Sequence, residues 1–415
     1  MRKYILSFVF ILPLSILFVS SIKVCKTFQD YSVFNFLGHN CMDNPILNRN
    51  ITEIIRDWPG YTAEEYYLTT EDGYIILIER AYKQITQKHP IIIAHGLGMN
   101  ALGWVDRGDV SLARLLGNLG YDVWMLNVRG TWYSKGHVNL TTSDKKYWKF
   151  TVDHVGLYDI RSMIKLVAER TKRQAIYIGY SMGTTGFYMF SSTYPEEAKR
   201  FVKGMISLAP VYNYKNARSV TKLLLPIWPL VRRFVYAMWN GEVLPGYSIF
   251  LRPFIRTSAG MYLIQFFCNF IFGDDFYEMD PLTYPIFASQ ILDTGGVELF
   301  SQLYQFLQIS NFTKFDYGKE KNLKMYGTAT APRYDLSKIP VPLSLFVGEN
   351  DWLATLTNAK DLMAAIRPDL RCGLQVVPYK KWTHLDFLIA KDLPKYLYKY
   401  LFQKIEEFGD GICRH

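Results

Sequence analysis

Residues 175–192 have the sequence AIYIGYSMGTTGFYMFSS, which is the most informative segment of the chain about its fold. Its first four residues are apolar and predict a short buried strand, whereas residues 184–192 have the pattern of a helix. Between them, residues 179–183 (GYSMG) form a Gly-x-Ser-x-Gly motif, whose glycines permit a turn too tight for a Cβ. This strand–turn–helix would place the Ser181 hydroxyl at a helix N-terminus, where the dipole favours a developing anion. Ser181 is therefore the candidate nucleophile.

Strand-like and helix-like segments alternate along the rest of the chain. Further apolar runs predict strands at residues 74–78, 91–94, 121–126, 204–208, 342–347 and 374–377. Helix-length patterns occupy residues 111–119, 157–169, 358–366 and 393–408. Nearly continuous apolar strands indicate a sheet that is buried on both faces, and the alternation predicts an α/β protein with a mostly parallel central sheet flanked by helices.

One interval, residues 211–339, is far longer than the connections of about 2–6 residues that such a fold needs. It is rich in Trp, Tyr, Phe and Leu, and we interpret it as a helical cap inserted into the fold, with a separate second domain as the alternative. The expected organisation is a signal peptide at 1–21, a core in two parts at 22–210 and 340–415, and the cap at 211–339.

A serine nucleophile needs a base, and the base needs an orienting carboxylate, in the chain order Ser, acid, His. Of the seven histidines only His384 and His415 follow Ser181, and His415 is the terminal residue, so His384 is the candidate base. Asp351 directly follows the predicted strand 342–347, at the end where catalytic groups gather in α/β sheets. Glu349 is the alternative acid, whereas Asp386 is too close to His384 in sequence.

Ester hydrolysis by such a serine also needs two N–H groups directed at the oxyanion. Met182, which follows the nucleophile, is one candidate donor. Leu97, in the glycine-containing turn after the predicted strand 91–94, is the other. His95 precedes the nucleophile in the same turn, and we expect its role to be structural.

The composition excludes several classes of protein. Apolar residues make up 49% and charged residues 20% of the chain, which excludes a disordered protein. The net charge of +10 comes from scattered residues, so we expect a basic globular surface and no nucleic-acid partner. Aromatic residues reach 16%, which suits an apolar ligand and core packing equally well.

The sequence at the N-terminus predicts a secretory signal peptide. Arg2 and Lys3 precede an apolar run at residues 4–19, and small residues permit cleavage after Ser21; an uncleaved anchor is the alternative. Asn-x-Ser/Thr sequons agree with entry into the secretory pathway, at Asn50, Asn139 and Asn311. Of the five cysteines, Cys25 and Cys41 form the best pair by proximity, and at least one thiol is left over. The absence of a CxxC motif or a Cys/His cluster predicts no metal, and no cofactor is expected.

Many motifs in order resemble the acid lipases of the gastric and lysosomal type. The matches lie at residues 50–74, 95–97 (HGL), 120–124 (GYDVW), 127–130 (NVRG), 133–137 (YSKGH), 181–185 (SMGTT), 208–211 (LAPV), 316–318 (DYG), 350–354 (NDWLA) and 384–387 (HLDF). They cover nearly the whole mature chain. The resemblance implies an α/β-hydrolase fold with a helical cap and lid, a Ser181–Asp351–His384 triad, and an oxyanion hole formed by Leu97 and Met182.

The chain also departs from that family's pattern. Tyr180 and Met182 replace the usual His and Gln around the nucleophile, and Gln302-Leu303 stands in place of a His-Trp pair. Thr355 stands where an Asp often follows Leu-Ala, and Cys268 is the single cysteine of the cap, so the gastric-type cap disulfide cannot form. These departures concern substrate preference and pH optimum more than mechanism.

The resulting hypothesis is a secreted or lysosomal serine lipase that hydrolyses neutral lipid esters, triacylglycerols or steryl esters, through an acyl-enzyme on Ser181. Its expected partner is the ester at a lipid–water interface, with no stable protein partner implied. The alternatives are a short-chain carboxylesterase and a catalytically silent lipid-binding protein of the same fold.

Overall fold

The computed structural model describes residues 23–31, 39–218, 226–243, 258–308 and 311–414. The predicted signal peptide, residues 1–21, lies outside the described residues. Within them, no helix combines the length and the apolar character needed to cross a membrane.

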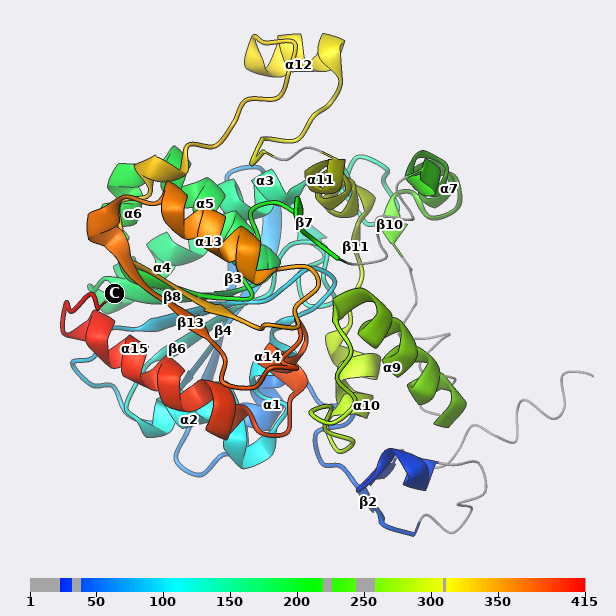
Figure 1. The fold of residues 1–415 in the computed structure, drawn as a ribbon, viewed down its shortest axis with the longest axis vertical. Coiled ribbons are helices and arrows are strands. Elements are labelled where there is room, and N and C mark those ends of the chain that lie inside the picture. The colour runs from blue at the N-terminus through cyan, green and yellow to red at the C-terminus, as the bar shows by residue number, and fades with distance from the viewer. Residues whose placement is uncertain (1–22, 32–38, 219–225, 244–257, 309–310, 415) are drawn as a thin grey trace, which may run out of the picture.

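A nine-stranded sheet forms the centre of the described structure (Figure 1). Its strands are β3 (Thr62–Thr69), β4 (Tyr74–Tyr82), β5 (Ile91–Ala94), β6 (Val123–Leu126), β7 (Gly136–His137), β8 (Ala175–Tyr180), β9 (Val202–Leu208), β12 (Leu343–Val347) and β13 (Arg371–Val376). The order is β13-β12-β9-β8-β5-β6-β4-β3, with β7 paired to β4. All pairs from β13 to β6 are parallel, and β4 pairs antiparallel with β3, β6 and β7. The predicted fold class, a mostly parallel sheet in an α/β protein, is confirmed.

Helices cover both faces of this sheet, which is why its inner strands are apolar throughout. Figure 1 shows α5 (Met182–Thr193) and α13 (Leu356–Ala365) on one face, and α2 (Leu112–Asn118) and α15 (Lys399–Gly409) on the other. Every residue of β5, β6, β8 and β12 is buried. The edge strand β3 was not predicted, because its sequence TAEEYYLT is largely polar and its side chains alternate between exposed and half-buried.

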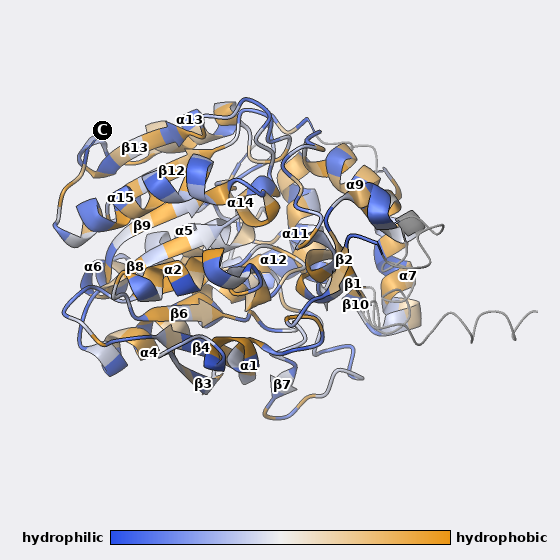
Figure 2. Cartoon of the chain, turned by 90° about the horizontal axis from the view of Figure 1, so that it is seen from below, coloured by the Kyte–Doolittle hydropathy of each residue, from blue (hydrophilic) through white to orange (hydrophobic). Residues whose placement is uncertain are grey.

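Between the end of β9 and the start of β12 the chain forms a group of helices. These are α7 (Trp228–Trp239), α9 (Ser258–Phe272), α10 (Tyr284–Ile286), α11 (Val297–Gln308) and α12 (Lys319–Tyr326). Two short strands, β10 (Glu242–Val243) and β11 (Gly295–Gly296), pair with each other beside them. Figures 1 and 2 place α7 and α9 at one end of the molecule, beyond the strands. The cap boundaries at residues 211 and 339 stay a prediction.

Disulfides fix two outlying parts of the chain. Cys25 in β1 (Lys23–Cys25) pairs with Cys41 in β2 (Cys41–Asp43), which confirms the predicted pair. A second bond joins Cys372 in β13 to Cys413 near the C-terminus, and it was not predicted because the two are 41 residues apart. Cys268 in α9 is the free, buried cysteine of the described residues.

Candidate active site

Ser181 lies at the junction of β8 and α5, in a conformation that few non-glycine residues adopt. Its φ is 50° and its ψ is −115°, and its N–H donates to the Leu208 carbonyl at 3.0 Å. A Cβ on Gly179 would lie 2.9 Å from the Gly183 backbone, and a Cβ on Gly183 would lie 2.6 Å from the Ala94 carbonyl oxygen. Both motif glycines are therefore required for the turn, which holds the serine side chain at the carboxyl end of the sheet.

The structure brings the three predicted triad side chains into one hydrogen-bonded chain. His384 Nε2 lies 2.8 Å from Ser181 Oγ, and His384 Nδ1 lies 2.8 Å from Asp351 Oδ2. The carboxylate facing Nδ1 can only accept, so the proton belongs on Nδ1 and the lone pair on Nε2 faces the serine hydroxyl. Asp351 Oδ1 also accepts from the N–H groups of Leu353 (2.8 Å) and Ala354 (2.7 Å). These bonds fix the carboxylate in place behind the imidazole.

The alternative acids lie differently. Glu349 is exposed on the turn after β12. Asp386 is buried and accepts from the Thr383 N–H at 2.5 Å, and burial raises the pKa of its carboxyl to about 7. Asp351 is thus the carboxylate that the structure places against His384.

The imidazole is packed between aromatic rings from the core and from the cap helix α9. Phe272, the last residue of α9, stacks on the His384 ring with centroids 5.7 Å apart and an angle of 11° between the planes. The His384 N–H donates to the Phe272 carbonyl at 3.3 Å. The Tyr180 hydroxyl donates to the His384 carbonyl at 3.0 Å. Tyr180, which departs from the family pattern before the nucleophile, therefore holds the loop that carries the base. This contact joins residues 204 positions apart, so no local pattern predicts it.

The two predicted oxyanion donors come from different segments, Met182 from the nucleophile turn and Leu97 from the loop after β5. Met182 is the first residue of α5, so its N–H has no acceptor within the helix. Leu97 lies in the loop after β5, and this loop approaches the nucleophile closely, because a Cβ on Gly96 would lie 3.0 Å from the Tyr180 ring. The sequence predicts that both N–H groups donate hydrogen bonds to an oxyanion beside Ser181. This role stays a prediction.

His95 stabilises that loop rather than reacting. Its Nε2 accepts from the Val128 N–H at 3.1 Å, so its Nδ1 carries the proton and donates to the Gly96 carbonyl at 2.8 Å. Burial lowers the pKa of His95 to about 4, which keeps the ring neutral near neutral pH. Its contacts agree with the structural role expected from the sequence.

Asp293 is a further residue of this region that sequence reasoning missed. Its N–H donates to the Gly98 carbonyl at 2.7 Å, and its carboxylate accepts from Asn100 Nδ2 at 2.8 Å and from the Trp132 N–H at 3.0 Å. Met99 and Leu292 form a β-bridge beside these bonds. The segment before α11 thus clamps the loop that carries Leu97. No local signal could reveal this, because Asp293 lies 193 residues from Asn100 in sequence.

The other departures lie away from the triad. Gln302 donates through Nε2 to Asp153 Oδ1 at 2.8 Å, and the buried Asp153 also accepts from the Tyr334 hydroxyl at 2.9 Å and the Phe315 N–H at 2.7 Å. This network joins α11 to the core. Thr355 caps α13 by accepting from the Asn358 N–H at 3.3 Å. Neither residue touches the reacting groups.

The predicted glycosylation sites differ in exposure. Asn139 is exposed in the loop after β7, and Asn311 is half-buried. Asn50 is exposed at the start of α1 (Ile51–Arg56), where its Oδ1 accepts from the Glu53 N–H at 2.8 Å. Among the described residues, no group of His, Cys, Asp and Glu has the arrangement of a metal site.

A serine on a strand–turn–helix, followed in sequence by an acid and a histidine at later strand ends, defines a serine hydrolase of the α/β-hydrolase class. Comparison with known proteins agrees. The family model described as "alpha/beta hydrolase fold" matches residues 89–390, and the "Partial alpha/beta-hydrolase lipase region" matches residues 51–108.

Relatives match along most of the chain. Mouse (Mus musculus) lipase member K is 31% identical over 88% of this chain and 92% of the relative. Gastric triacylglycerol lipase from Rattus norvegicus is 28% identical over 93% of this chain and 98% of the relative. A Crotalus adamanteus protein, provisionally named a lysosomal acid lipase/cholesteryl ester hydrolase, is 30% identical over 88% and 92%. The chain belongs to this lipase family of the α/β hydrolases, and it is a carboxylic ester hydrolase.

Proposed function

We propose that this protein is a serine lipase that hydrolyses neutral lipid esters, triacylglycerols or steryl esters, through an acyl-enzyme formed on Ser181. The observation that carries the proposal is the unbroken hydrogen-bonded chain from Ser181 Oγ through His384 to Asp351. We assign the two oxyanion donors to the backbone N–H groups of Leu97 and Met182.

The reaction follows from these positions. His384 Nε2 takes the proton of Ser181 as the oxygen attacks the ester carbonyl, and the resulting oxyanion accepts from the Leu97 and Met182 N–H groups. Asp351 stabilises the imidazolium, which then protonates the departing alcohol. Water, deprotonated by His384, attacks the acyl-enzyme and releases the fatty acid.

The exposed surface of the cap helices supports a water-insoluble substrate. α9 contains no Asp, Glu, Lys or Arg, and it exposes Phe266 and Phe270. α7 exposes Leu230 (65%) and Phe234 (52%) on one side of the helix. Large apolar side chains at such exposure mark surfaces that meet another apolar phase. The names of the rat and Crotalus relatives supply the two ester classes, triacylglycerols and cholesteryl esters.

We place the protein in the secretory pathway, as a secreted or lysosomal glycoprotein. Support comes from the sequence at residues 1–21, the sequons at Asn50, Asn139 and Asn311, the Cys25–Cys41 and Cys372–Cys413 disulfides, and the gastric and lysosomal names of relatives. N-terminal sequencing of protein from an expressing cell tests cleavage of the signal. The mass of the protein before and after enzymatic removal of N-glycans tests glycosylation. Retention of residues 1–21 or an unchanged mass would contradict the signal or the glycans, respectively.

The test of function compares wild type with Ser181→Ala on emulsified triolein, cholesteryl oleate and a soluble short-chain ester. We expect the wild type to hydrolyse at least one long-chain ester and Ser181→Ala to lose all but background activity. Hydrolysis of the soluble ester alone would favour the short-chain carboxylesterase. Lipid binding without hydrolysis would favour the silent lipid-binding protein.

A further inference from the structure

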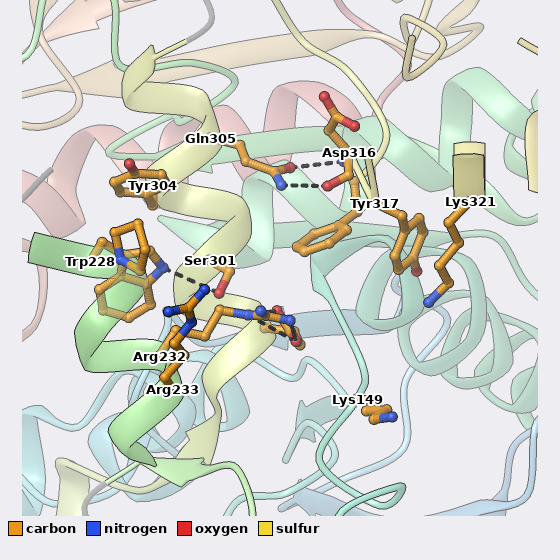
Figure 3. Close-up of a pocket in the computed structure, with 13 residues that line it drawn as sticks. Lys149, Trp228, Arg232, Arg233, Ser301, Tyr304, Gln305, Asp316, Tyr317 and Lys321 are labelled. Atoms are coloured by element: carbon orange, nitrogen blue, oxygen red, sulfur yellow. Dashed lines mark hydrogen bonds and ion pairs between the residues drawn. The ribbon is translucent and has the colours of Figure 1, made fainter. Parts of the chain in front are cut away.

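A cavity of about 460 Å³ lies between the helices that follow β9 and Lys149 of the core, apart from the triad. It is lined by α7, α11, α12 and the segment before α12, as Figure 3 shows, and it is open to solvent at the exposed Lys149, Arg233 and Lys321. Its lining shares no residue with the triad or with the oxyanion loop. A volume of this size falls in the range of about 300–1,000 Å³ that small-molecule sites occupy.

Aromatic rings form the apolar walls of this cavity. Trp228 of α7 stacks on Tyr304 of α11, with centroids 6.1 Å apart and 27° between the planes. Phe315 and Tyr317 form a second pair, with centroids 4.7 Å apart. The Trp228 indole N–H donates to Ser301 Oγ at 3.3 Å, so its polar edge is already satisfied. The walls therefore offer a surface for a hydrocarbon chain.

The carboxylates that line the cavity are already bound to other groups. Glu298 accepts from Arg232 Nε at 3.0 Å, and also from the Tyr236 hydroxyl at 2.8 Å. Asp316 Oδ1 accepts from the Gly318 N–H at 2.8 Å and from Asn322 Nδ2 at 2.7 Å. Neither carboxylate pairs with the remaining cations of the cavity.

Three lining cations remain without an acidic partner. Across the described ranges, Lys149, Arg233 and Lys321 form no ion pair, and Lys321 rests over the Tyr317 ring at 4.1 Å. In Figure 3, Arg232 and Arg233 come from α7 on one side of the cavity, and Lys149 and Lys321 lie on the opposite side. An anion between them would meet positive charge from both sides.

We propose that this cavity binds an amphiphilic anion, a single acidic head on a hydrocarbon chain. The head would lie between Lys149, Arg233 and Lys321, where charge-assisted hydrogen bonds are available, and the chain would lie along the aromatic walls. A neutral ester would gain less from these cations, because it accepts hydrogen bonds but carries no charge to pair with them. Two sources share the required chemistry, a free fatty acid carboxylate and the headgroup of an acidic phospholipid. The site is independent of turnover and goes beyond the proposed hydrolysis.

Binding is measured by calorimetry at pH 7 on full-length Ser181→Ala protein, which cannot turn over an ester. The ligand is laurate below its micelle concentration, with glycerol monolaurate as the neutral probe of equal chain length. Added to this background, Lys149→Gln, Arg233→Gln and Lys321→Gln together remove the three lining cations that form no ion pair. A matched variant carries Arg56→Gln, Lys172→Gln and Lys360→Gln, which change exposed cations outside the cavity by the same charge.

We expect the cavity variant to bind laurate at least about tenfold more weakly than the matched variant, with equal binding of monolaurate by both. A second arm uses phosphatidylcholine vesicles with and without phosphatidylglycerol. Charge-dependent binding to the acidic vesicles but not to laurate assigns the site to a phospholipid head, and the reverse assigns it to a fatty acid. Equal binding of laurate and of acidic vesicles by both variants overturns the proposal, whether or not the protein is a lipase.

Discussion

The nucleophile turn and the helices between β9 and β12 are held in place in different ways. The turn depends on backbone contacts at van der Waals distance, where Gly179 and Gly183 leave no room for a side chain. The helices between β9 and β12 pack on the core through apolar side chains such as Phe287 and Ile291, and single polar side chains add contacts at particular points, such as Asp293 at the loop that carries Leu97 and Gln302 at Asp153. A change in the turn should therefore act on every reacting group at once, whereas a change in one of these polar side chains should act on one contact.

The largest effect is expected from Gly183→Ala. Its Cβ would lie 2.6 Å from the Ala94 carbonyl oxygen, so the strand and the helix must separate and Ser181 must move. Misplacement of a nucleophile by about 1 Å can cost about 100-fold in rate, and we expect at least that loss of kcat on a soluble ester. Gly409→Ala in α15, where a Cβ meets nothing within 4 Å, is the control and should keep wild-type activity. Full activity of Gly183→Ala would show that the turn tolerates a side chain.

A smaller effect is expected from Tyr180→Phe. The change removes the 3.0 Å bond to the His384 carbonyl and leaves that buried oxygen without this donor, which costs about 1–2 kcal/mol. We expect kcat to fall about tenfold with KM unchanged, because the base loses its position and the substrate does not. Tyr188→Phe loses a comparable 2.7 Å bond to Ser207 Oγ and should lose stability without loss of kcat. Equal kcat values for the two variants would show that the Tyr180 hydroxyl does not position His384.

These two regions also differ in how much the sequence could predict. The residues around Ser181 specify a strand, a turn and a helix within one short stretch, and chain order leads from there to Asp351 and His384. The hydrogen bonds of Asp293 and the Cys372–Cys413 disulfide join segments that are far apart in sequence. Periodicity and local motifs do not predict such contacts. The strand β3 was missed for a different reason, since a half-exposed edge strand lacks an apolar run.

The third prediction concerns the contacts of Asp293 with the loop that carries Leu97, and it uses the variant Asp293→Asn. The amide keeps the size of the side chain but replaces one of the two oxygens that accept from Asn100, Trp132 and Thr294. We expect kcat to fall about threefold to fivefold, less than 1 kcal/mol of transition-state stabilisation, because the loop keeps its backbone bond to Gly98. Asp361→Asn, an exposed change of equal chemistry on α13, should leave kcat unaltered. A kcat of Asp293→Asn equal to wild type would limit Asp293 to a purely structural contact.

The smallest effect concerns pH. Burial raises the pKa of several carboxyls, to about 6 or 7, at Asp293, Asp106, Asp386 and Glu79. Between about pH 4 and these values the folded state holds more protons than the unfolded state, so the free energy of unfolding from these groups falls as pH rises. His95 and His154 act in the opposite direction, since burial lowers their pKa to about 4 and the unfolded state binds more protons below about pH 6.5.

We expect the four carboxyls to have the larger effect on the free energy of unfolding, because they outnumber the two histidines. The melting temperature should therefore be higher at pH 5 than at pH 7 by about 2–4 °C. Asp386→Asn should reduce this difference, and Asp361→Asn should not. A melting temperature that rises from pH 5 to pH 7 in the wild type would mean that the buried histidines dominate.

The proposed hydrolysis requires that Ser181 is the nucleophile and that His384 activates it. The most direct measurement is mass spectrometry of peptides after reaction with a fluorophosphonate, on wild type, His384→Ala and Asp351→Asn proteins of verified fold. We predict a single adduct on Ser181 in the wild type, with a rate of formation lowered by about 100-fold or more in His384→Ala. An adduct on another residue, or an unchanged rate without the imidazole, would contradict the account.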